Sequence, residues 1–263
     1  MDKEKLKKLA ENPEFIPGIY NYCDRWCERC PVTQRCMNFA LCEEQFGDSQ
    51  DLDVNTGDLL HGVSRMFQVT REMLKEFAER EGIDLDSLDL QEACDRQRTI
   101  EDTVRSHECC RSAKSYIEMV TNWFDSARNV FEQMQGELDL QARLELPGSD
   151  PHTEAAHLID SVEVIRWYQH QIYVKLVRAM SGTLEDGPHE MPKDSDGSAK
   201  IALIGIDRSI AAWDQMRNHL PEREDDILDI LVHLDQLRSR TETTFPDARA
   251  FVRLGFDDIG QHG

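Results

Sequence analysis

Apolar residues recur at intervals of three and four through most of this chain, and that periodicity limits its fold more than any other feature. Such spacing places apolar side chains along one face of a helix. The clearest examples lie at about 58–80, 100–144, 153–182, 198–216 and 221–244. No run of alternating apolar and polar residues predicts a β-strand. We therefore predict an all-α protein.

Capping residues and helix breakers indicate where these helices begin and end. Gly82 supplies a left-handed stop after the first segment, and Thr153 and Ser198 are the predicted N-caps of the third and fourth. Pro221 marks the start of the last helix, and residues 183–197 predict an exposed loop. Long amphipathic helices must bury their apolar faces against one another, so we predict an antiparallel bundle of about four long helices.

The cysteines are concentrated near the start of the chain. Five of the eight stand between residues 23 and 42, and none follows residue 110. A chain of 263 residues can form one large domain or two small ones. The uneven distribution predicts a short Cys-rich, metal-binding module over residues 1–50 and a helical bundle over residues 51–263, packed together as one globular unit.

Four of these cysteines are spaced as ligands of one metal centre. Cys23, Cys27 and Cys30 form the pattern C-x3-C-x2-C, and Cys36 follows after five residues. On a helix the first three would lie within about 60° of one another, and on a loop they would still be close in space. Cys42 stands six residues after Cys36, on nearly the opposite face of a helix, so we expect only one of that pair to be a ligand and favour Cys36.

We predict that the centre is an iron–sulfur cluster. A short run of cysteine thiolates followed by proline, here Cys30-Pro31, is typical of such sites, and nearby aromatic residues would limit the access of water. Zinc is the alternative, although only Cys27 and Cys30 form the C-x2-C knuckle that tetrahedral zinc sites commonly use. A third possibility is that the cysteines bind no metal and pack as small buried residues.

The triplet also resembles the cluster-binding motif of the radical S-adenosylmethionine enzymes. The resemblance covers only residues 23–30, and Arg29 stands where an aromatic residue is usual. Those enzymes are built on α/β barrels, and this chain lacks the alternation of strands and helices that a barrel requires. We therefore exclude that family.

A weaker group of candidate ligands follows the cluster. Cys94, His107, Cys109 and Cys110 could add ligands to the same centre. Adjacent residues on a helix point about 100° apart, so Cys109 and Cys110 cannot easily face one ion. Structural burial is the expected role of at least one of them.

The helical segments also contain part of a di-iron carboxylate pattern. Such sites need a Glu-x-x-His element on each of two helices and a glutamate from each of two others. Glu154 and His157 form one such element, and Glu163 and His170 share a face of the same helix. A second Glu-x-x-His element is missing. Because the match is only partial, a di-iron oxidoreductase is the alternative to the Cys-rich centre rather than the first choice. No phosphate-binding loop or nucleophile motif is present, which favours a structural, redox-sensing or electron-transfer role.

The charge balance indicates which partners are excluded. The chain has 51 acidic and 30 basic residues, for a formal charge of −21. That charge argues against nucleic acids and against anionic membrane surfaces, both of which attract lysine and arginine. The N-terminal residues lack an apolar targeting segment, so we expect a cytoplasmic protein. A protein partner, as for a zinc-stabilised adaptor, is possible, and the pattern indicates no particular oligomeric state.

Overall fold

The computed structural model describes residues 3–46, 56–85, 90–144, 150–184 and 194–257. Within these ranges the chain forms α-helices and short 3-10 turns and no β-strand, which confirms the all-α prediction. A bundle of about four long helices is not confirmed as the architecture of the whole chain, because these ranges contain nine α-helices. They are α1 (Lys3–Ala10), α2 (Met37–Phe46), α3 (Thr56–Glu81), α4 (Leu90–Ser106), α5 (Glu108–Ser126), α6 (Arg128–Leu144), α7 (Pro151–Leu184), α8 (Asp194–His219) and α9 (Glu224–Thr244).

The chain divides into two compact units. Unit 1 comprises residues 1–97 together with 252–263, and unit 2 comprises residues 98–251. The division therefore falls inside α4, and the last residues of the chain belong with the first. The predicted module boundary at residue 50 lies outside the described residues.

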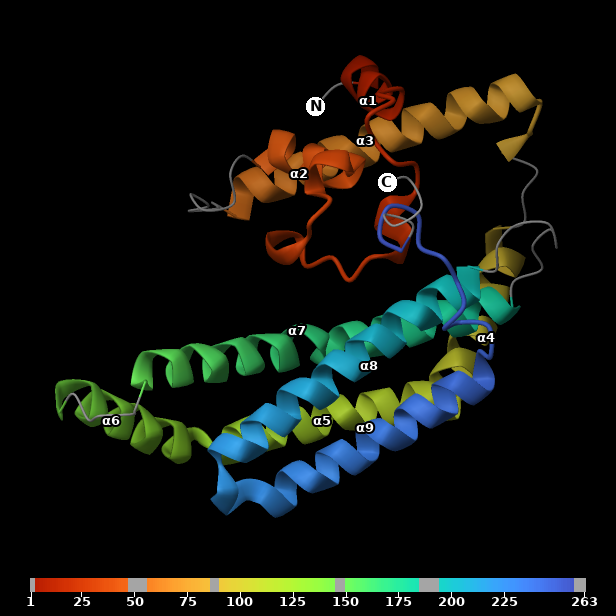
Figure 1. The fold of residues 1–263 in the computed structure, drawn as a ribbon. Coiled ribbons are helices and arrows are strands. Elements are labelled where there is room, and N and C mark those ends of the chain that lie inside the picture. Colours follow the sequence, from red (N-terminus) through yellow and green to blue (C-terminus); the bar gives the residue numbers. More distant parts are fainter. Residues whose placement is uncertain (1–2, 47–55, 86–89, 145–149, 185–193, 258–263) are drawn as a thin grey trace. The chain divides into compact units, whose positions relative to one another are not determined.

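Four helices form the core of unit 2. α7 packs along α8, α8 along α9, and α5 contacts both α7 and α9, so the four run side by side (Figure 1). α6 packs on α7. The apolar faces of these helices meet in a core that includes large, fully buried side chains: Tyr116, Ile165, Tyr168, Ile172, Leu176, Ile206 and Trp213. Gly205 lets α8 approach α7 closely, because a Cβ there would lie 2.9 Å from Cδ1 of Tyr168.

Several predicted helix boundaries in unit 2 are wrong. The segment at 100–144 is interrupted twice, at His107, whose side chain caps α5, and at Ala127, which ends it. Asp150, rather than Thr153, caps α7, because its carboxylate accepts hydrogen bonds from the Thr153 backbone N–H (3.1 Å) and hydroxyl (2.7 Å). Ser198 is fully buried inside α8, which begins at Asp194. Residues 183–184 and 194–197 of the predicted loop are helical, and 185–193 lies outside the described residues.

Unit 1 combines α1, α2, α3 and the start of α4 with a series of short turns. Three 3-10 turns, at Ile19–Tyr22, Cys27–Arg29 and Thr33–Arg35, lie between α1 and α2. A C-terminal turn belongs to the same unit: Gly255 has a φ of 80°, and a Cβ there would lie 2.6 Å from Cδ1 of Ile16 and 2.8 Å from Cδ1 of Ile19. Only glycine allows so close an approach. The predicted stop at Gly82 is confirmed, with a φ of 68° directly after α3.

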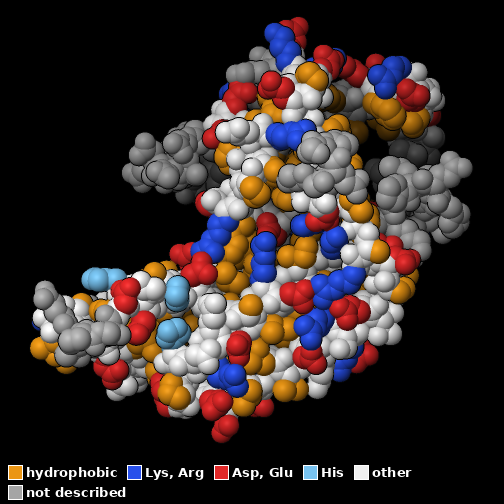
Figure 2. Space-filling model, in the orientation of Figure 1, with side chains coloured by type: hydrophobic (Ala, Val, Ile, Leu, Met, Phe, Trp, Pro, Cys, Tyr) orange, Lys and Arg blue, Asp and Glu red, His pale blue; other side chains and the backbone are white. Residues whose placement is uncertain are grey.

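The surface is strongly charged, as the composition requires. The face drawn in Figure 2 carries acidic and basic side chains interspersed with hydrophobic ones. Among the residues whose structure is described, no helix combines the length and the apolar character needed to cross a membrane.

Candidate functional site

The Cys-rich segment of unit 1 folds into successive turns rather than into one helix. Cys23 follows the first 3-10 turn in extended backbone. Cys27 begins the second turn and Cys30 ends it, the Cys30 N–H donating to the Cys27 carbonyl at 3.1 Å. Cys36 ends the third turn, its N–H donating to the Thr33 carbonyl at 3.0 Å. Each turn therefore delivers a cysteine at its end, and the loop alternative of the sequence analysis is the one observed.

Backbone and side-chain contacts hold these turns together. The Ile16 N–H donates to the Arg35 carbonyl at 3.0 Å and closes the segment into a loop. Arg25 has a φ of 59°, which is uncommon for a residue other than glycine. This left-handed residue turns the chain between Cys23 and Cys27. The Asp24 carboxylate accepts from the Trp26 N–H at 3.3 Å and supports the same turn.

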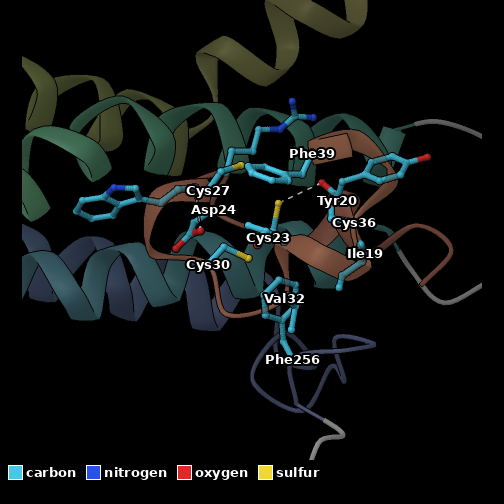
Figure 3. Close-up of a pocket in the computed structure, with 13 residues that line it drawn as sticks. Ile19, Tyr20, Cys23, Asp24, Cys27, Cys30, Val32, Cys36, Phe39 and Phe256 are labelled. Atoms are coloured by element: carbon cyan, nitrogen blue, oxygen red, sulfur yellow. Dashed lines mark hydrogen bonds between the residues drawn. The ribbon is translucent and has the colours of Figure 1, made fainter. Parts of the chain in front are cut away.

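The four predicted ligands line one pocket. Cys23, Cys27, Cys30 and Cys36 share it with six apolar or aromatic side chains: Ile19, Tyr20, Trp26, Val32, Phe39 and Phe256. In Figure 3 the sulfur atoms of Cys23, Cys27 and Cys30 lie toward the middle of this group of side chains. The sulfur of Cys23 donates to the Tyr20 carbonyl at 3.5 Å. All four cysteines are half-buried, and none of the eight cysteines forms a disulfide.

Burial keeps the Cys27 thiol neutral. Partial desolvation, together with the neighbouring Cys23, Cys30 and Cys36, raises the pKa of Cys27 from 9.0 to about 11. The guanidinium of Arg29 lies 4.1 Å from the centre of the Trp26 ring, where it stacks on the indole at the edge of the site. At neutral pH the Cys27 side chain is therefore a thiol, with thiolate formation opposed by its surroundings.

The thiols line a common pocket without being arranged around a single point. Among the described residues, no group of three or more His, Cys, Asp or Glu side chains is placed to hold a metal ion as it stands.

The remaining cysteines lie elsewhere. Cys42 on α2 and Cys94 on α4 are exposed and do not line the pocket. Cys109 and Cys110 are almost fully buried in unit 2, where burial raises the pKa of Cys110 to about 12. The ring of His107 accepts a hydrogen bond from the Cys109 N–H at 3.2 Å. These contacts give His107 and the buried pair structural roles within the helices.

The residues of the di-iron alternative are not gathered into a site. Glu154, His157, Glu163 and His170 are all exposed along α7. A di-iron centre needs inward-facing ligands from several helices. The apolar side of α7 instead carries the core residues Ile165, Ile172 and Leu176.

Some pocket residues were not predicted from the sequence. Phe256 comes from the far end of the chain, and its place in the pocket depends on the C-terminal turn at Gly255. Val32 and Ile19 also line it, in segments without helical periodicity. In the sequence only Gly255 indicated a tight turn here, and the apolar periodicity did not indicate which segment that turn would contact.

Comparison of the chain with protein-family models, with curated proteins and with solved structures gives no match.

Proposed function

We propose that unit 1 binds an iron–sulfur cluster through Cys23, Cys27, Cys30 and Cys36. The observation that carries the proposal is that four cysteines, delivered by separate turns, line one apolar pocket. Cysteine thiolates are the usual ligands of such clusters, and apolar surroundings limit access of water to them.

A bound cation would relieve the crowding of these thiols. Burial is the main cause of the raised pKa of Cys27, and the neighbouring cysteines add to it, because thiolates at this site would repel one another. Metal binding replaces thiol protons with a cation and so removes the repulsion.

The chemistry of the segment favours a cluster over a single zinc ion. A short run of cysteines followed by proline, here Cys30-Pro31, is typical of cluster sites, whereas only Cys27 and Cys30 form the C-x2-C knuckle common at tetrahedral zinc. The described residues contain no group of three or more ligand side chains placed to hold a metal ion as it stands.

The half-buried position of the cysteines would let a centre bound there exchange electrons with a partner or react with an oxidant. A centre held by half-buried ligands would lie near the surface of unit 1. Electron transfer and redox sensing both need such access, and a structural role is compatible with it. Free thiols and an oxidation-sensitive centre are best maintained in the reducing cytoplasm, where we place the protein.

Metal analysis of anaerobically purified full-length protein tests the proposal. We expect iron and acid-labile sulfide, with absorbance at about 400 nm. Individual replacement of Cys23, Cys27, Cys30 or Cys36 by alanine should reduce the iron content severalfold. Cys42→Ala and Cys94→Ala are matched controls, because these cysteines are exposed and lie outside the pocket.

Other outcomes would overturn the proposal. Stoichiometric zinc in a colourless protein would replace the cluster with a zinc site, as in a zinc-stabilised adaptor. Iron that persists in all four alanine variants would place the metal elsewhere. Absence of any bound metal would leave the cysteines with a packing role.

A further inference from the structure

α3 carries a regular row of side chains that is separate from the cysteine pocket. The positions alternate by three and four residues, as in a heptad pattern. At 100° per residue they fall within about 100° of the helix circumference. The row consists of Leu60, Val63, Phe67, Thr70, Leu74 and Phe77.

This row is exposed. Phe67 has 71% of its surface accessible, Leu60 63% and Leu74 61%, and Phe77 and Val63 are also exposed. The half-buried residues Gly62, Val69 and Met73 lie on another side of the helix, whereas the buried Ala78 lies beside the C-terminal end of the row. Between Leu60 and Phe77 the row itself is turned to solvent.

An exposed apolar row of this length is unusual for a helix with so little other support. α3 is absent from the helix pairs that pack extensively in the described part of the chain. A helix in water gains most of its stability from the packing of its apolar face. The row offers on the order of 600 Å² per copy, so that two such rows together reach the lower end of specific interfaces.

We propose that two copies of this chain associate through this row, with the two α3 helices antiparallel. A two-fold axis, the commonest symmetry of homo-oligomers, brings the same patch of both copies together. Antiparallel pairing centred between residues 68 and 69 sets Leu60 against Phe77, and Val63 against Leu74, of the other copy.

The centre of the row supports the antiparallel direction. There the large Phe67 faces the small Thr70 of the second copy, whereas parallel pairing would oppose two phenylalanines. The Thr70 hydroxyl already donates to the Met66 carbonyl at 3.0 Å, so its polar group has a partner and its methyl group can be buried. Antiparallel pairing also opposes the helix dipoles.

The oligomeric state of the full-length protein tests the interface. We expect a dimer by sedimentation velocity from about 1 to about 100 μM. Phe67→Glu should shift the protein to monomer, with unchanged helix content by circular dichroism. Val174→Glu is the matched control, because Val174 is 55% exposed on α7, outside the row, and should leave the dimer intact. A monomeric parent protein, or a dimeric Phe67→Glu variant, would overturn the proposal.

A mixing experiment tests the direction. Val63→Lys and Leu74→Glu should each weaken self-association at least tenfold. Their equimolar mixture should form a heterodimer, because antiparallel pairing sets the new lysine against the new glutamate. A mixture that stays monomeric would overturn the antiparallel arrangement. The interface does not depend on the metal proposal, since neither variant touches the cysteine pocket.

Discussion

The two units of this protein differ in how much apolar surface they bury. Unit 2 buries large apolar side chains completely, including Trp213, Tyr116 and Leu176, and the rings of Trp123 and Trp213 meet edge to face at 4.9 Å. Among the described residues of unit 1, the buried apolar side chains are few: Ile19, Trp26, Val32 and Ala78. Most of its pocket residues are only half-buried and lie on turns.

This difference indicates what each unit needs in order to stay folded. Burial of apolar surface dominates folding, and unit 2 has a continuous core to provide it. A segment of turns with a small core commonly relies on a crosslink such as a bound metal. The proposed centre would therefore be a large part of the stability of unit 1 and a negligible part of that of unit 2.

Removal of the metal should produce the largest difference between the units. Structural metal sites contribute their binding free energy directly to folding. Treatment with a chelator under anaerobic conditions should lower the local opening free energy of residues 16–36 by at least about 2 kcal/mol. Hydrogen exchange measures this, with α7 and α8 as internal reference. Equal loss of protection in both units would contradict the division of roles.

Truncation of the unit 2 core should lower the unfolding free energy of unit 2 and leave the metal content of unit 1 unchanged. Trp213→Ala removes a fully buried ring and should cost about 3–5 kcal/mol of unfolding free energy. Denaturant titration followed by circular dichroism measures the loss, while the metal content stays that of the parent protein. Val232→Ala, at an exposed position on α9, should cost less than about 0.5 kcal/mol. A comparable cost at both positions would argue against the described core.

The close approach of α8 to α7 should be sensitive to added volume. Gly205→Leu would force side-chain atoms against Tyr168 and Ile172, both nearly fully buried, and should cost about 1–3 kcal/mol. Gly136→Ala on α6 is the opposite case, because no atom lies within 4 Å of its added Cβ, and it should stabilise by about 0.5–1 kcal/mol. Thermal unfolding checks both variants: the midpoint temperature should fall for Gly205→Leu and rise for Gly136→Ala.

The buried tyrosine of unit 2 should make a smaller, pH-dependent contribution. Burial raises the pKa of Tyr116 from 10.0 to about 12, so folding favours its neutral form. The stability that depends on that form is complete below pH 10 and is lost as the pH rises toward 12. Tyr116→Phe removes the acceptor of the Trp213 N–H (3.2 Å) and should cost about 1 kcal/mol at neutral pH.

Unfolding free energies of the parent and Tyr116→Phe proteins at pH 7 and pH 11 check this expectation. The difference between them should shrink at the higher pH, because the phenylalanine ring has no proton to lose. A difference that grows with pH would show that the sign of the shift is wrong.

Helix type and approximate extent were predictable because each helix carries its own apolar periodicity. The range of α3 follows closely from that pattern and from Gly82. α7 begins at Pro151, before the predicted cap at Thr153, and α9 begins at Glu224, after a 3-10 turn that starts at Pro221. The interruptions at His107 and Ala127 were not predictable, because apolar spacing continues through both. The Ser198 cap was wrong because α8 extends to Asp194 and buries the serine, a consequence of packing that the local sequence does not carry.

The candidate site was partly predictable for a similar reason. Cys23, Cys27, Cys30 and Cys36 are close in sequence, so any compact local structure brings them near one another, and they share a pocket. Phe256 was not predictable, because it reaches the pocket through contacts between the two ends of the chain. The sequence also left open whether the segment is helix or loop, and the structure resolves that choice as 3-10 turns.

X-ray absorption at the iron edge of anaerobically purified protein tests the central claim most directly. Iron held by the four cysteines should show only sulfur neighbours, at about 2.3 Å, together with a short iron–iron distance. Nitrogen or oxygen neighbours in place of sulfur would show that these thiols do not hold the metal, and the account of unit 1 would then fail.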